Sequence, residues 1–268
     1  MKNKGAGRTA LVTGGTSGIG LETAKALRDR GCRVYTLSRR PASVPGIVSL
    51  TADVTDEAAV NEAVSSLLAD AGRIDILVNC AGFGISGAIE FTNLSDAKKQ
   101  FDVNFFGAVS VTKAVLPHMR KQGDGMIVNI SSVAAPVSIP FQAFYSSAKA
   151  ALNAFSAALA NEVRPYGIRV TAVQPGDIRT GFTAAREKSA LGDDEYGGRI
   201  SRSVSKMERD EQNGMDPAKA GVYIAAQALR KSVPPVSTIG FSYKAVCALA
   251  RILPASLFNR IVGSLYAK

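Results

Sequence analysis

Thr13-Gly14-Gly15-Thr16-Ser17-Gly18-Ile19-Gly20 is the stretch that decides the fold. It joins a β-rich run, residues 8–13, to residues 19–30, whose apolar side chains recur at helical spacing. Its glycines allow a tight turn and a close backbone approach to a pyrophosphate, whose charge then meets the helix N-terminus. The stretch therefore predicts a dinucleotide-binding turn at the start of a βαβ unit. The candidate contacts are Gly14, Thr16, Ser17, Gly18, Ile19 and Gly20.

Short apolar runs alternate with helical patterns along the rest of the chain. The runs that favour strands are residues 8–13, 33–38, 47–50, 75–79, 126–131 and 168–173. The patterns that favour helices are residues 19–30, 56–69, 95–119 and 143–163, and a further helix opens at residues 216–217. This alternation predicts an α/β fold, a doubly wound parallel sheet (Rossmann fold) with helices on both faces. Because no repeat or linker divides the chain, we expect one domain over residues 1–268.

Residues 181–214 depart from this regularity, because they are polar, punctuated by glycine and mixed in charge. The segment follows the carboxyl end of a predicted strand, where ligands bind in open α/β sheets. Segments of this length are usually functional or disordered. We interpret it as a mobile lid over the site; the alternative is a plain surface excursion.

The end of the second predicted strand indicates which dinucleotide binds. A cofactor without a 2′-phosphate usually meets an Asp or Glu there, whereas this chain has Ser38-Arg39-Arg40. Guanidinium groups bind phosphate bidentately. We therefore predict NADP(H), with Arg39 as the main ligand and Arg40 and Ser38 in support; the alternative is a solvated charged turn.

Charge and cysteine usage bound the remaining function classes. The net charge is +10, and no Asp or Glu occurs in residues 217–268. The basic residues of that segment are Lys219, Arg230, Lys231, Lys244, Arg251, Arg260 and Lys268. No aromatic-basic interleaving accompanies them, so nucleic-acid binding is not expected. The three separated cysteines suggest a reducing compartment, hence a cytoplasmic location, and no metal is expected.

Two features point to the chemistry. Tyr145 and Lys149 are four residues apart in a predicted helix, which puts them on one face. A neighbouring ammonium favours the phenolate, so we expect Lys149 to lower the pKa of Tyr145. Ser132 ends the preceding strand, where its hydroxyl can donate to a carbonyl oxygen as negative charge develops.

With these motifs, residues 9–240 resemble the short-chain dehydrogenase/reductase family, in its compact single-domain branch. Residues 13–20 match the family's Thr-Gly-x-x-x-Gly-x-Gly turn, and Asn79-Cys80-Ala81-Gly82 resembles its Asn-Asn-Ala-Gly motif with cysteine in the second position. Asn104, Ser132, Tyr145 and Lys149 match the catalytic tetrad. The further cofactor contacts that the resemblance implies are Asp53, Val54, Asn79, Ala81, Gly82, Pro175, Gly176, Ile178 and Thr180.

The resemblance also implies a division of labour. Ser132 polarises the substrate carbonyl while the nicotinamide delivers hydride to its carbon. Tyr145 donates or removes the proton, and Lys149 lowers the pKa of Tyr145 and binds the nicotinamide ribose. Asn104 holds a water behind Lys149 that completes a proton relay.

An apolar wall around Ser132 indicates the substrate class. Its candidate substrate contacts are Phe83, Ala134, Val137, Phe141 and Phe182. Such a wall leaves the desolvation of a sugar or an acid uncompensated, so a steroid, retinoid or acyl-chain ketone is expected. The alternatives are a 3-oxoacyl thioester or other small ketone and, from another class, a non-catalytic NADP(H)-binding regulator.

The C-terminal residues 241–268 read as two amphipathic helices divided by Pro254. They resemble the tails of 17β-hydroxysteroid dehydrogenase-like and retinol dehydrogenase-like members, which act on lipophilic substrates. One hypothesis is that this basic tail rests on a membrane surface. The alternative is that it packs on the domain or on a second subunit of a homodimer or homotetramer.

Overall fold

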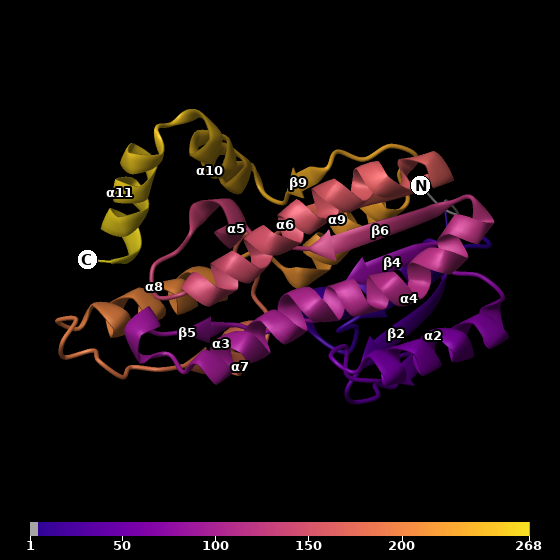
Figure 1. The fold of residues 1–268 in the computed structure, drawn as a ribbon, viewed down its shortest axis with the longest axis horizontal. Helices are drawn as coiled ribbons and strands as arrows, with labels where there is room; N and C mark the ends of the chain where they lie inside the picture. Colours follow the sequence, from indigo (N-terminus) through magenta and orange to yellow (C-terminus); the bar gives the residue numbers. More distant parts are fainter. Residues whose placement is uncertain (1–4, 268) are drawn as a thin grey trace.

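Seven parallel strands form the central sheet, in the order β3-β2-β1-β4-β6-β7-β9 (Figure 1). Their bounds are β1 Thr9–Thr13, β2 Arg33–Ser38, β3 Ile47–Thr51, β4 Ile76–Asn79, β6 Gly125–Ile130, β7 Ile168–Gln174 and β9 Val236–Thr238. This computed structural model describes residues 5–267. The six predicted runs lie in this sheet and β9 adds a seventh strand that was not predicted, so the predicted fold class is confirmed.

Helices cover both faces of the sheet. On one face lie α1 (Gly18–Arg28) and α9 (Pro217–Ala228), and on the other lie α2 (Glu57–Ala71), α4 (Gly107–Gln122) and α6 (Ala143–Val163). The alternation of strand side chains divides the core: Ala10 and Val12 pack with α1 and α9, whereas Leu11 packs with the opposite helices. A strand buried on both faces explains why these runs are continuously apolar.

The predicted single helix over residues 95–119 is three segments. They are α3 (Leu94–Phe101), a π-helical turn η2 (Asp102–Phe106) and α4. The π turn adds a residue to the helical repeat, which side-chain periodicity does not report, and such turns occur often at functional sites. Asn104 lies in this π turn, so the turn determines the direction in which the Asn104 side chain leaves the helix.

Residues 181–214 contain regular structure that the sequence analysis missed. The segment forms α7 (Phe182–Ala185), β8 (Glu187–Lys188) and α8 (Arg199–Gln212), and β8 pairs with β5 (Ile85–Ser86). Helix α8 buries Ile200, Val204 and Met207, a helical spacing hidden among charged residues. The segment therefore covers the loop after β4.

The C-terminal residues form α10 (Phe241–Ile252) and α11 (Ala255–Tyr266), which stand off one end of the sheet near α8 (Figure 1). Lys268 lies outside the described residues. The remaining short elements are η1 (Ile89–Phe91), α5 (Ala134–Val137) and η3 (Arg164–Tyr166). Within residues 5–267, no helix combines the length and apolarity needed to cross a membrane.

Candidate active site

The glycine turn after β1 meets the segment after β7. Gly14 and Gly18 have positive φ values of 64° and 52°, which glycine adopts at little cost. A Cβ on Gly14 would lie 2.9 Å from the Ala81 Cα, and one on Gly18 would lie 3.4 Å from the Thr180 Cβ. Three candidate cofactor segments, following β1, β4 and β7, therefore converge at the carboxyl edge of the sheet.

This turn fits a pyrophosphate. Ser17 is the N-cap of α1, but its side chain makes no capping hydrogen bond, so the first N–H groups of the helix remain available. A Cβ on Gly20 would clash with the Gly14 carbonyl, so glycine at residue 20 lets α1 begin close to the strand. These features favour a dinucleotide phosphate at the turn.

The end of β2 presents two free cations. Arg39 and Arg40 are exposed, and neither has a hydrogen bond or ion pair with any residue from 5 to 267. The Ser38 hydroxyl is buried without a hydrogen-bond partner in the same part of the chain. Asp53 accepts hydrogen bonds from the backbone and hydroxyl of Thr55, and Val54 packs in the core. The 38–40 group therefore has unused donors where a 2′-phosphate is expected.

Three of the candidate catalytic side chains lie together. The Ser132 hydroxyl lies near the Tyr145 hydroxyl, close enough to lower the pKa of that phenol. The Lys149 Nζ lies 5.6 Å from the centroid of the Tyr145 ring and donates to the Ile130 carbonyl at 2.8 Å. The serine follows β6 and the other two residues lie on α6, so one strand-to-helix connection assembles the group.

Burial sets the acid–base properties of this group. It raises the pKa of Tyr145 to about 12, against the lowering effect of the Ser132 hydroxyl. It also lowers the pKa of Lys149 to about 8. Desolvation of the phenolate outweighs the influences that lower the Tyr145 pKa, and the expected lowering by Lys149 stays a prediction.

Asn104 positions the loop after β4. Its carboxamide accepts from the Phe83 backbone N–H at 2.9 Å and donates to the Phe83 carbonyl at 2.8 Å. A Cβ on Gly82 would lie 3.0 Å from the Asn104 Oδ1 and 3.6 Å from the Lys149 Nζ, which places Asn104 close to the lysine. Gln100 also donates to the Phe83 carbonyl, at 3.1 Å, and the sequence analysis missed this residue. A polar side chain one helical turn before Asn104 was the available signal.

The Asn79 side chain makes hydrogen bonds to other buried residues. Its Nδ2 donates to the Asn129 Oδ1 at 2.8 Å and to the Thr112 hydroxyl at 3.1 Å, which ties β4 to β6 and α4. Its role as a cofactor contact stays a prediction. After β7, Ile178 is buried in the core, and Gly176 lies directly beneath the Tyr243 ring of α10, where a Cβ would clash.

The five candidate substrate contacts fall into two groups. Phe182 lies against Tyr145, with ring centroids 5.7 Å apart, and the Lys99 Nζ lies 5.4 Å from the centroid of the Phe83 ring. The other three, Ala134, Val137 and Phe141, are buried. Val137 packs on the C-terminal helices, and Phe141 packs on α8. Packing thus occupies part of the expected wall, while the Phe182 ring lies against the Tyr145 ring.

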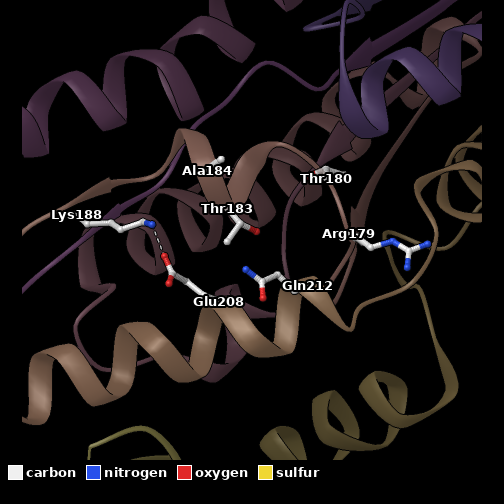
Figure 2. Close-up of a pocket in the computed structure, with 7 residues that line it drawn as sticks. All are labelled: Arg179, Thr180, Thr183, Ala184, Lys188, Glu208 and Gln212. Atoms are coloured by element: carbon white, nitrogen blue, oxygen red, sulfur yellow. Dashed lines mark ion pairs between the residues drawn. The ribbon is translucent and has the colours of Figure 1, made fainter.

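A cavity of about 310 Å³ opens beside Thr180 on the lid side of this edge. Figure 2 shows Lys188 and Glu208 pointing toward one another as an ion pair, whereas Arg179 points away from both. The lining residues are Arg179, Thr180, Thr183, Ala184, Lys188, Glu208 and Gln212. The space next to the candidate nicotinamide segment is therefore lined mostly by polar residue types, which present mainly their carbon atoms to it.

Known proteins match the chain over most of its length. A model of the family described as short chain dehydrogenase matches residues 8–190. The 3-ketodihydrosphingosine reductase of Bacteroides thetaiotaomicron is 40% identical over 261 residues, which cover 96% of this chain and 97% of that protein.

Solved structures agree with the sequence matches. A short-chain dehydrogenase from Streptomyces avermitilis superposes with a TM-score of 0.81 at 32% identity, covering 96% of this chain and 94% of that one. A 3-ketoacyl-(acyl-carrier-protein) reductase from Brucella melitensis, complexed with NADH, has a TM-score of 0.75 at 25% identity, covering 87% and 97%. The chain therefore belongs to the short-chain dehydrogenase family, whose fold binds a nicotinamide cofactor and whose members are oxidoreductases of carbonyl and CH–OH groups.

Proposed function

We propose that this protein is an NADP(H)-dependent oxidoreductase that interconverts a carbonyl and an alcohol on a small, largely apolar molecule. The observation that carries the proposal is the proximity of the Ser132 and Tyr145 hydroxyls, with Lys149 one helical turn away. This pair lies at the same sheet edge as the glycine turn. The free guanidinium groups of Arg39 and Arg40 support the phosphorylated cofactor.

The assigned roles follow from the geometry. A bound nicotinamide supplies the hydride for reduction or accepts it in oxidation. The Ser132 hydroxyl donates to the substrate carbonyl oxygen as negative charge builds there. Tyr145 retains its proton at neutral pH because burial raises its pKa, so it can give that proton to the same oxygen. Lys149 supplies positive charge behind the tyrosine, and Asn104 fixes the loop that carries Gly82.

A long-chain ketone is the substrate class that we favour. The Bacteroides relative is by name a reductase of 3-ketodihydrosphingosine, a long-chain amino alcohol ketone. The aromatic ring of Phe182 beside Tyr145 suits an apolar chain. A steroid or retinoid is the less favoured form of the same proposal. The Brucella structure, a 3-ketoacyl reductase, supports the alternative of a 3-oxoacyl thioester.

A substrate screen tests the proposed function. NADPH oxidation is measured with 3-ketodihydrosphingosine, ketosteroids, retinal, long-chain ketones and acetoacetyl thioesters. We expect turnover of the long-chain ketones, and a Tyr145→Phe variant that loses about 100-fold or more in kcat because the general acid is gone. Tyr166→Phe, a change of the same kind at an exposed tyrosine, is the control. Turnover that survives Tyr145→Phe contradicts the assignment of the acid.

The C-terminal helices support a location at a membrane surface. The apolar residues of α11 are divided: Phe258, Val262 and Tyr266 pack inward, whereas other apolar residues of both C-terminal helices are exposed. The exposed ones are Phe241, Leu249, Ile252, Leu257, Ile261 and Leu265. Basic residues accompany them without any acid, which complements anionic lipid. We propose a peripheral contact of this tail with the cytoplasmic leaflet; a homodimer or homotetramer stays a prediction.

A further inference from the structure

Arg186 is a buried arginine beside the proposed reaction site. It directly follows α7, and it is 4% exposed. Its Cζ lies 5.5 Å from the centroid of the Phe182 ring, and that ring lies 5.7 Å from the Tyr145 ring. A Cβ on Gly84, in the loop after β4, would lie 3.5 Å from the Arg186 Nε. The guanidinium therefore stands one aromatic ring away from the candidate acid.

The hydrogen-bond donors of Arg186 are only partly used. Its Nη2 pairs with a carboxylate oxygen of Glu211 on α8, and the other carboxylate oxygen accepts from the Thr183 hydroxyl at 2.7 Å. Its Nε and Nη1 are buried without a hydrogen-bond partner among residues 5–267. Buried donors are normally satisfied, and leaving those of a charged group vacant is costly. No residue from 5 to 267 supplies a hydrogen-bond acceptor for these two nitrogen atoms.

A purely structural role does not account for these donors. The ion pair fastens α7 to α8, but this uses a single nitrogen of the guanidinium. Two apolar side chains of similar volume would join the same helices without burying charge. The Arg186 Nε, which takes no part in the ion pair, lies near Gly84, and the guanidinium carbon lies over the Phe182 ring.

The charge balance of the pair selects the ligand. Glu211 is itself largely buried, with 14% of its side chain exposed, so the pair is close to neutral. A substrate carboxylate would be repelled by Glu211, and an ammonium would be repelled by Arg186. A hydroxyl group suits both residues, since its oxygen accepts from the guanidinium and its proton can be donated to the carboxylate, which has lone pairs to spare.

We infer that Arg186 and Glu211 form a subsite that recognises a hydroxyl group carried by the ketone substrate. The inference rests on the proposed function, and it narrows the substrate to an apolar hydroxy ketone. The subsite makes Arg186 a specificity residue that plays no part in hydride or proton transfer.

A matched pair of ketones tests the subsite in the unmodified protein. We expect kcat/KM with NADPH to be at least about tenfold higher for 1-hydroxydodecan-3-one than for dodecan-3-one, because the second leaves the buried donors unpaired. Equal kcat/KM for the two ketones overturns the subsite and leaves the proposed function standing. If neither ketone is reduced, nor any compound of the screen, the proposed function fails and the subsite fails with it.

Substitution of Arg186 tests whether this residue causes the preference for the hydroxy ketone. In Arg186→Met we expect the preference to disappear through a loss with the hydroxy ketone, while kcat/KM for dodecan-3-one stays within about twofold. Arg209→Met removes an exposed arginine of α8 that does not line the cavity, and it should leave both values unchanged. An equal loss with both ketones in Arg186→Met shows a structural role and overturns the inference.

Discussion

Lys149 and Tyr145 lie one turn apart on α6, and burial acts on both in the same sense. Each group is driven toward its neutral form, because water no longer solvates the charge. The phenol therefore keeps its proton, as an acid for carbonyl reduction must, while the ammonium titrates near neutral pH. Burial thus favours a protonated tyrosine, whereas the spacing in sequence suggested an ionised one.

The pH profile of reduction should report Lys149. The group acts as a cation, and its pKa of about 8 means that the charge is lost as pH rises through that value. Tyr145 loses its proton only near pH 12, so it does not limit the profile first. We expect kcat/KM for NADPH-dependent reduction to fall above about pH 8, since kcat/KM reports the free enzyme.

Lys149→Arg provides the control for that profile, because arginine stays charged throughout. Whatever activity the variant retains should persist to higher pH than in the unmodified protein. A descending limb at the same pH in both proteins would assign the titration to another group.

Arg39→Asp should reverse part of the cofactor preference. The change removes the guanidinium from a 2′-phosphate and adds like charge, so the preference for NADPH over NADH, as the ratio of kcat/KM values, should fall about 10- to 100-fold. Lys121→Asp makes the same charge change at the end of α4, just before the amino end of β6 and thus at the opposite edge of the sheet. It should leave the ratio unaltered. An unchanged ratio in Arg39→Asp would move the assignment to Arg40.

At the scale of elements, the C-terminal helices are tied to the lid and to the segment after β7. The Tyr243 hydroxyl donates to Asp177 at 2.6 Å, and the Arg199 Nε at the start of α8 donates to the Ala267 carbonyl at 2.6 Å. The Tyr266 hydroxyl lies 3.5 Å from Asp210 on α8. A membrane surface that binds α10 and α11 would therefore also restrain α8 and the segment after β7, which lie beside the site.

Membrane contact by these helices is tested with vesicles. We expect the protein to co-sediment with phosphatidylglycerol-containing vesicles at low salt and to be released at high salt, because basic residues attract anionic lipid. Ile261→Asp should weaken the binding about tenfold or more by placing charge on the exposed face of α11. Leu191→Asp, at an equally apolar exposed position outside these helices, is the matched control. No co-sedimentation at low salt rejects the contact.

At the scale of the whole molecule, the parallel sheet makes one edge chemically distinct. Every segment with a candidate role follows the carboxyl end of a strand or the helix that continues from it, so parallel order alone gathers them. The two helical layers bury both faces, which leaves that edge as the place for a ligand. The lid joins it through the short pairing of β8 with β5.

The sequence alone determined the alternation of the main strands and helices along the chain. It also determined the glycine turn and the group of Ser132, Tyr145 and Lys149. These features are local: a strand alternates, a turn needs glycine, and two residues four apart share a helical face. Arg39 and Arg40 belong here too, since they directly follow a strand.

Only the tertiary structure decided what surrounds those groups. Desolvation fixed the direction of the Tyr145 and Lys149 pKa shifts, because burial depends on elements distant in the chain. The π turn at Asn104 and the folding of residues 181–214 escaped prediction for the same reason. The pairing of Arg186 with Glu211 joins residues 25 apart across two helices, and no spacing rule links them. Solvent exclusion and long-range contact, which no local pattern encodes, set these properties.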